Sequence, residues 1–139
     1  MSKSQRIAKQ IADGCIAQRA GQLDRTIARI YDGHLRPLGL RRPQLTTLVA
    51  LTLHEGVRAG QLASALRIEK STLSRNVARL ADQGLVAIRE TDDGGRALFL
   101  TKSGRAKLVE AHPAWKAAQR EARAFVDEAA LARLAKALP

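Results

Sequence analysis

One segment of the 139-residue chain, residues 70–83, combines hydroxyl, amide and guanidinium groups at helical spacing. Leu73, Val77 and Leu80 lie at i, i+4 and i+7, which predicts an amphipathic helix anchored on a core. The opposite face would present Ser71, Thr72, Arg75, Asn76 and Arg79. Arginine can bridge O6 and N7 of guanine, and hydroxyls can donate or accept at base edges. We therefore expect base reading in a DNA major groove by Ser71, Thr72, Ser74, Arg75 and Asn76. Lys70 and Arg79 are expected to meet phosphates.

The rest of the chain offers no constellation suited to catalysis. His34, His54 and His112 are far apart and lack metal-ligand spacing. Cys15 is the only cysteine, which excludes an internal disulfide and a zinc site built from several cysteines. No glycine-rich phosphate loop is present, and two adjacent aspartates at 92–93 suit a turn. The sequence therefore predicts a protein that is not an enzyme and needs no cofactor or metal.

The neighbouring segments would form a helix-turn-helix followed by a hairpin. A short helix is expected over residues 59–66, then a turn at 67–69. Strands at 85–90 and 96–100 flank an Asp-Asp-Gly-Gly turn, which predicts a β-hairpin. Together these elements predict a winged helix. Arg89 and Arg96 on the hairpin are the candidates for contact with the adjacent minor groove. The assignment of Arg96 stays open by a residue or two.

Helical periodicity extends on both sides of this unit. Residues 5–35 read as one long helix, which Gly14 and Gly21 weaken, with a bend or break expected near position 20. Further helices are expected over 43–54, 102–112, 114–125 and 127–138. Thr101 or Ser103 would cap the helix from 102, and Pro113 either ends it or kinks one longer helix. The long first helix favours packing against a second chain, and folding back on its own domain is the alternative.

Charge and composition point to the same class of partner. The chain has a net charge of +11, with 45% hydrophobic and only 3% aromatic residues, which suits a basic helical domain. Residues 41–107 carry twelve basic and six acidic side chains, whereas residues 108–139 carry five and four. The surplus therefore centres on the predicted winged helix and indicates a polyanion. No apolar run reaches membrane-spanning length and no signal-peptide pattern follows the start, so we expect a cytoplasmic protein.

Several stretches, in this order and spacing, resemble the MarR family of bacterial transcription regulators. They are residues 31–32, 35–40 (LRPLGL), 61–66 (QLASAL), 71–80 (STLSRNVARL), 83–86 (QGLV) and 100–104 (LTKSG). The resemblance covers most of residues 15–125. It implies an obligate homodimer with intertwined terminal helices, in which two winged helices bind a near-palindromic operator. It also implies release of DNA by a small, often aromatic or phenolic, ligand that binds between the dimerisation and DNA-binding regions.

The resemblance assigns roles along the chain and leaves two departures. Residues 1–40 and 102–139 would serve dimerisation, and residues 41–101 DNA binding. Tyr31, His34 and Trp115 are the candidate pocket residues. The family hairpin often carries an Asp-x-Arg tip, where this chain has Gly94 and Gly95. The helix from 59 lacks the family's Ser or Thr cap, so its amide end is free or meets a phosphate.

The leading hypothesis is a homodimeric, sequence-specific DNA-binding regulator, with repression and ligand response expected. A second hypothesis is a redox-sensing regulator, because Cys15 lies close to the position of the reactive cysteine in the peroxide-sensing branch of the family. Arg19, one turn on, would then favour the thiolate. A non-specific architectural DNA-binding protein is a third hypothesis, and a winged helix used for protein contacts is a fourth.

Overall fold

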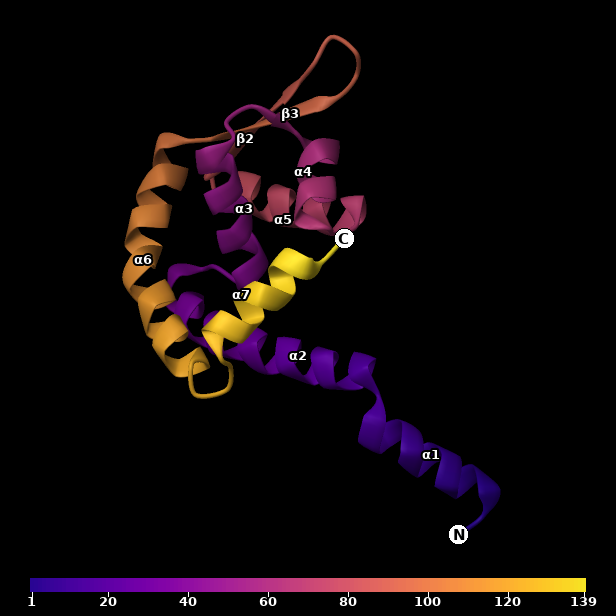
Figure 1. Cartoon of the computed structure of the whole chain (residues 1–139). Coiled ribbons are helices and arrows are strands. Elements are labelled where there is room, and N and C mark those ends of the chain that lie inside the picture. Colours follow the sequence, from indigo (N-terminus) through magenta and orange to yellow (C-terminus); the bar gives the residue numbers. More distant parts are fainter.

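The computed structural model describes residues 1–139 and shows a mainly helical chain with a small hairpin (Figure 1). The helices are α1 (Lys3–Gly14), α2 (Ile16–Leu35), α3 (Arg42–Leu53), α4 (Ala59–Leu66), α5 (Lys70–Asp82), α6 (Lys102–Ala122) and α7 (Glu128–Ala137). A 3-10 turn, η1 (Arg36–Leu38), joins α2 to α3, and the strands are β1 (Val57–Arg58), β2 (Val86–Glu90) and β3 (Arg96–Leu100). The expected winged helix-turn-helix, with further helices at both ends, is confirmed.

The core lies where α3, α4, α5 and the sheet meet. Leu48 and Leu80 have no exposed side-chain surface, and Leu98 of β3 is 1% exposed. The three residues that predicted the apolar face of α5, Leu73, Val77 and Leu80, are all buried. Because one face of α5 is fixed in this way, its other face is held toward solvent.

The predicted hairpin is confirmed, and the sheet contains one strand more than the sequence indicated. Strand order is β1-β3-β2, and β2 pairs antiparallel with β3 in a register that joins Val86 to Leu100 and Glu90 to Arg96. The additional strand β1 pairs Val57 with Leu98 on the other edge of β3. A two-residue strand carries no period of its own, so only its pairing with β3 reveals it.

Helix α6 runs unbroken through Pro113, so the expected end near His112 is wrong and the alternative of one longer helix is right. The Oγ of Thr101 accepts a hydrogen bond from the Gly104 amide at 3.0 Å, which selects Thr101 over Ser103 as the cap. A Cβ at position 104 would collide with the Leu85 carbonyl, so glycine allows the first turn of α6 to reach the sheet. From there α6 packs along α2 and α3, with Ala111 and Ala118 buried.

The first long helix breaks at Cys15, earlier than the bend expected near position 20. Cys15 has an extended backbone (φ −71°, ψ 112°) and both ends α1 and begins α2, whereas Gly21 remains helical inside α2. Beyond the break, α1 projects away from the rest of the chain and buries no residue (Figure 1). Helix α7 also buries none. No helix combines the length and apolar character that crossing a membrane requires.

Candidate nucleic-acid interface

The exposed face of α5 carries the side chains that were predicted to read DNA. Lys70, Ser71, Ser74, Arg75 and Arg79 are exposed, and Thr72 and Asn76 are half-buried. Nη2 of Arg75 lies 3.4 Å from Oγ1 of Thr72, a long hydrogen bond that leaves most of the guanidinium free. The amide nitrogen of Asn76 is buried without a partner. Six of the seven residues thus present polar groups on one accessible face, and Asn76 lies at its inner edge.

The turn that places α5 depends on one strained residue. Arg67 ends α4 in the left-handed region (φ 55°), and its amide hydrogen-bonds to the Ser64 carbonyl at 3.1 Å. The start of α4 follows Arg58, which forms no side-chain cap. Unpaired amides at a helix start are suited to binding an anion such as a phosphate. The absence of a side-chain cap, expected from Ala59, is confirmed, and the residue at the cap position is Arg58.

Arg89 and Arg96, the two arginines expected to contact DNA from the wing, lie in different surroundings. The guanidinium of Arg89 stacks 4.6 Å from the ring centre of Phe99 on the neighbouring strand. Arg96 is exposed and lines a small cleft of about 50 Å³ with Ser74 and Ala78 of α5. Arg96 therefore lies next to the turn of the hairpin, where it pairs with Glu90, and its side chain reaches back toward α5.

The tip of the wing is held by a residue that the sequence did not single out. Nη2 of Arg58 donates to a carboxylate oxygen of Asp93 and, at 2.9 Å, to Oγ1 of Thr91. The same Asp93 oxygen accepts from Thr91 Oγ1 at 2.5 Å and from the Gly95 amide at 3.2 Å. The hydrogen bond from Arg58, followed by those from Thr91 and Gly95, holds the pKa of Asp93 well below its usual range. The only sequence signals were an arginine immediately before the helix expected from residue 59 and an acidic turn in the hairpin.

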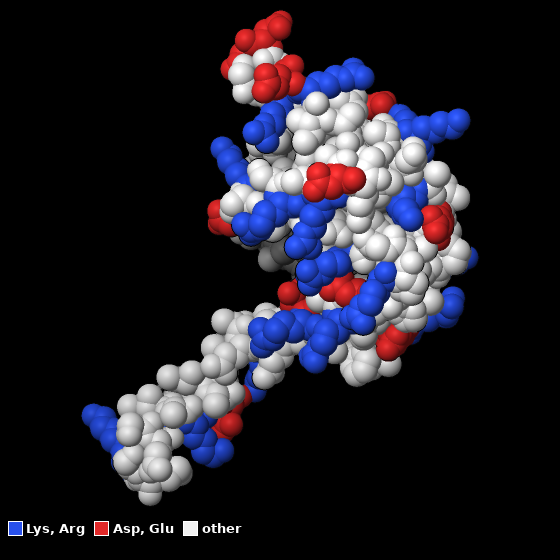
Figure 2. Space-filling view, turned by 180° about the vertical axis from the view of Figure 1, so that it is seen from behind, with Lys and Arg blue, Asp and Glu red and all other residues white.

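The charge distribution is uneven over the face that contains the wing. In Figure 2 the wing tip is a projecting lobe with acidic atoms, and basic side chains gather below it toward α2. Most of the ion pairs in the chain join exposed groups, so they leave the cations accessible to a polyanion.

A second feature is a largely apolar cavity of about 650 Å³ between α2, α3 and α6. It is lined by Tyr31, Arg42, Leu45, Thr46, Val49, Leu108, Val109, Ala111, His112 and Trp115. Two of the three expected pocket residues, Tyr31 and Trp115, lie here. The third, His34, does not line the cavity, because its Nε2 is bonded to the Glu121 carboxylate 2.6 Å away.

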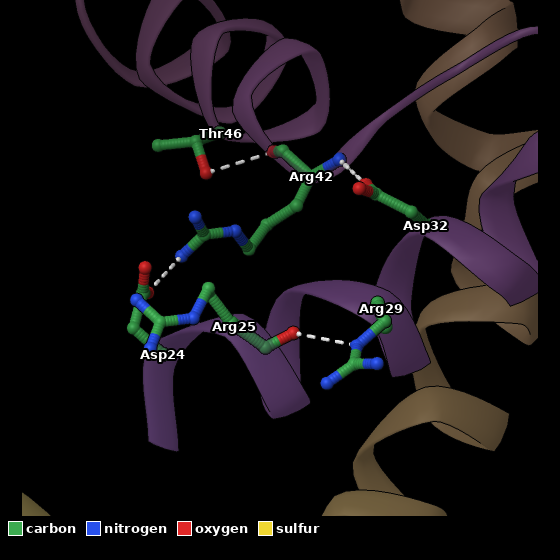
Figure 3. Close-up of polar contacts among 6 residues, drawn as sticks. All are labelled: Asp24, Arg25, Arg29, Asp32, Arg42 and Thr46. Atoms are coloured by element: carbon green, nitrogen blue, oxygen red, sulfur yellow. Dashed lines mark hydrogen bonds and ion pairs between the residues drawn. The ribbon is translucent and has the colours of Figure 1, made fainter. Parts of the chain in front are cut away.

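Arg42, which lines the cavity from the start of α3, is bonded to two aspartates of α2 (Figure 3). The backbone amide of Arg42 donates to Asp32 at 2.7 Å, and its Nη1 donates to Asp24 at 3.1 Å. Nε of Arg42 is buried and has no partner. Tyr31 donates its hydroxyl hydrogen to Gln119, and burial, followed by the charge of Glu128, raises the pKa of Tyr31. Arg42 was missed by the sequence analysis, since only its neighbours in space reveal it.

The remaining candidate, Cys15, is half-buried at the junction of α1 and α2. The guanidinium of Arg19 donates to the backbone carbonyl of Asp13. No cluster of three or more His, Cys, Asp or Glu side chains has an arrangement that could hold a metal ion.

Comparisons with known proteins agree with this geometry. The model of the MarR family matches residues 38–97. The transcriptional regulator MosR of M. tuberculosis is 32% identical, with 91% of this chain and 98% of MosR covered and a TM-score of 0.74. MosR in complex with DNA gives 31% identity, coverage of 89% and 96%, and a TM-score of 0.76. A mutant of E. coli MarR complexed with operator DNA shares the fold, at 20% identity, coverage of 93% and 97%, and a TM-score of 0.79. No curated protein sequence matches.

The helix-turn-helix, the hairpin and the polar face of α5 together define a winged helix-turn-helix protein. With a relative of 32% identity matched over almost its whole length, the chain belongs to the MarR family and is a transcriptional regulator of that family.

Proposed function

We propose that the protein is a homodimeric, sequence-specific regulator that binds double-stranded DNA and represses transcription from a near-palindromic operator. The observation that carries this proposal is the exposed polar face of α5, which the buried Leu73, Val77 and Leu80 hold in a fixed orientation. MosR, the relative at 31% identity, has been seen in complex with DNA. The net charge of +11 supports a polyanionic partner.

In this proposal the N-terminal part of α5 enters the major groove. Arg75 reads a guanine edge, while Ser71, Thr72 and Ser74 serve donor or acceptor positions, and Asn76 supports them from the inner edge of the face. Lys70 and Arg79 contact phosphates, which fix the register of the helix. Arg96 lies beside α5 and Arg89 lies on the first strand of the wing, so both can add contacts to the flanking backbone.

The proposed division of the chain is supported by exposed apolar residues on α1 and α7. Residues 41–101 form the DNA-binding unit, and residues 1–40 and 102–139 serve dimerisation. The apolar side chains at the ends support this assignment: Ile11 of α1 is 52% exposed and Leu134 of α7 is 65% exposed in the single chain. A two-fold dimer would set two α5 helices about 34–36 Å apart, one turn of DNA.

The cavity between α2, α3 and α6 is proposed as the effector site. Its apolar walls and the ring of Trp115 suit a small aromatic or phenolic ligand. Arg42, which lines the cavity, offers that ligand a charged hydrogen-bond donor. Because Trp115 is the only tryptophan, its fluorescence reports binding directly. Benzoate should quench or shift this emission at lower concentration than cyclohexanol, and equal responses would contradict the assignment.

The proposed function is tested by the Arg75→Ala variant. Loss of a bidentate base contact should weaken operator binding by about 1–3 kcal/mol and relax the preference at one base pair. Arg105→Ala is the matched control, because Arg105 is an exposed, ion-paired arginine on α6. Operator affinity should change in the first variant and not in the second. Wild-type affinity in Arg75→Ala would show that the recognition-helix assignment is wrong.

A further inference from the structure

Arg58 belongs to the body of the domain in sequence but to the wing in space. It lies on β1, immediately before α4, and its guanidinium reaches the tip of the β2–β3 hairpin more than 30 residues along the chain. There it contacts Thr91, the first residue of the turn, and Asp93 within the turn. The tip thus acquires a guanidinium from outside the hairpin.

The hairpin turn is built to receive this guanidinium. A Cβ at position 95 would lie 2.9 Å from Oγ1 of Thr91 and 3.1 Å from Nη2 of Arg58, so glycine leaves the space that the guanidinium and its partner use. Three donors converge on one oxygen of Asp93: Nη2 of Arg58, Oγ1 of Thr91 and the Gly95 amide. Such convergence fixes the carboxylate, and the carboxylate in turn fixes the guanidinium.

The guanidinium retains capacity for a second partner. Both of its hydrogen bonds use Nη2, and an arginine carries five N–H donors. Its side chain is 44% exposed, and Nη1 and Nε form no hydrogen bond within the chain. A phosphate oxygen is the acceptor that matches this fork in charge and shape.

Because the tip of the wing is acidic, its contact with a DNA backbone needs a cation at the tip. Asp92 and Asp93 lie at the end of the lobe that projects from the molecule, where Figure 2 shows acidic atoms. Two carboxylates would repel a DNA backbone. Arg96 is next to the turn, but it lines the cleft with Ser74 and Ala78 of α5 and forms no ion pair with either aspartate.

We propose that Arg58, held at the wing tip by Asp93 and Thr91, is a phosphate-contacting residue of the wing. This inference rests on the proposed function, since it needs DNA beside α5. Asp93 and Thr91 are positioning residues: they orient the guanidinium and do not touch the DNA. The contact is to the backbone, so it contributes affinity and register but no base preference.

The experiment compares operator and shuffled duplexes over a range of salt concentrations, using the full chain. One phosphate contact corresponds to a salt slope of about 0.9, or about an eightfold change in affinity between 0.1 and 1 M salt. Arg58→Gln should therefore bind both duplexes about eightfold more weakly at 0.1 M salt, with a slope smaller by about 0.9. Arg58→Lys should keep the slope. Arg105→Gln, which breaks a similar exposed pair with Glu55, should leave both quantities unchanged.

A double variant distinguishes a direct contact between Arg58 and phosphate from simple neutralisation of the acidic tip. In Arg58→Gln combined with Asp93→Asn, the charge that Arg58 neutralised is also absent. If Arg58 contacts a phosphate, the double variant keeps the reduced slope. A double variant with the wild-type slope, or an Arg58→Gln variant that binds like wild type, would overturn the inference while leaving the proposed function intact. Failure of the wild type to prefer its operator would overturn the proposed function instead.

Discussion

The winged-helix body and the two ends of the chain differ in how completely they bury their apolar residues. In the body, Leu48, Leu80 and Leu98 are closed off from solvent. At the ends, α1 and α7 bury nothing, although each has an amphipathic sequence. The body therefore buries its apolar residues within a single chain, whereas α1 and α7 can bury theirs only against another surface.

This difference separates two properties that the chain must combine. The packing beneath α5 holds its exposed polar face in place, independently of how the N- and C-terminal helices pack. In the proposed dimer, the spacing between two such faces would depend on α1, α6 and α7 and on what they pack against. In the proposed dimer, base recognition is thus a property of one chain, and operator recognition is a property of two.

The largest effect is expected from a variant that places a charge on the exposed apolar face of α1. Ile11→Glu should disrupt the proposed dimer, because a carboxylate would be buried in the interface. Loss of the second reading head should weaken operator binding by about 10²–10⁴-fold. Light scattering after size exclusion gives the molecular mass, and a duplex titration gives the affinity.

Gln10→Glu is the matched control for this variant, because it introduces the same side chain one residue away on the exposed surface of α1. It should remain dimeric and bind DNA normally. A monomeric wild type, or an Ile11→Glu variant that stays dimeric, would show that α1 does not serve dimerisation.

A pair of leucine truncations compares the body with the ends directly. Leu80→Ala removes a side chain with no exposed surface and should cost about 2–5 kcal/mol in the free energy of unfolding, at every protein concentration. Leu134→Ala, at a residue 65% exposed in the single chain, should destabilise only through weaker association. Thermal melts at several concentrations distinguish the two. Equal, concentration-independent losses would contradict the comparison.

The sequence predicted the body better than the ends, for a physical reason. Residues such as Leu73, Val77 and Leu80 bury one helical face, so their period is visible in the sequence and located α5 to within a residue. At the N-terminal end, Gly14 and Gly21 both weaken the helical pattern, and the break was expected near position 20. The chain breaks next to Gly14, at Cys15, while Gly21 stays helical. Local propensity alone cannot choose between two such glycines.

The polar sites also differ in how well the sequence predicts them. The reading face of α5 could be predicted because its residues lie within one helix. Arg58 could not, because its partner Asp93 is 35 positions away and the strand that carries it has only two residues. Arg42 was missed at the cavity for the same reason, since it is placed by Asp24 and Asp32 on another helix.

The junction between body and C-terminal end provides a smaller test. Thr101 accepts from the Gly104 amide at 3.0 Å and donates to the Gly84 carbonyl at 2.7 Å, so it joins the start of α6 to the end of α5. Thr101→Ala should cost about 1 kcal/mol in the free energy of unfolding. Ser103→Ala, at the second candidate cap, should cost little. Chemical denaturation measures both, and a reversed order would mean that the cap is misassigned.

The smallest expected effect concerns acid titration of the wing. Arg58 lowers the pKa of Asp93, so the stabilisation from this pair is present above the usual value of 3.8 and is lost as the pH falls toward the lowered pKa. A carboxyl-detected NMR titration should place the pKa of Asp93 below 3.8 in the wild type and closer to 3.8 in Arg58→Gln, where the hydrogen bonds from Thr91 and Gly95 still lower it. An unshifted Asp93 in the wild type would mean that the pair does not persist in solution.

The central claim is that each chain recognises one half-site through α5 and that a second copy is needed to recognise the operator. Selection of bound duplexes from a random pool tests this claim most directly. The account predicts enrichment of two inverted half-sites whose centres lie about 10–10.5 base pairs apart. An unenriched pool, or single half-sites without fixed spacing, would contradict it.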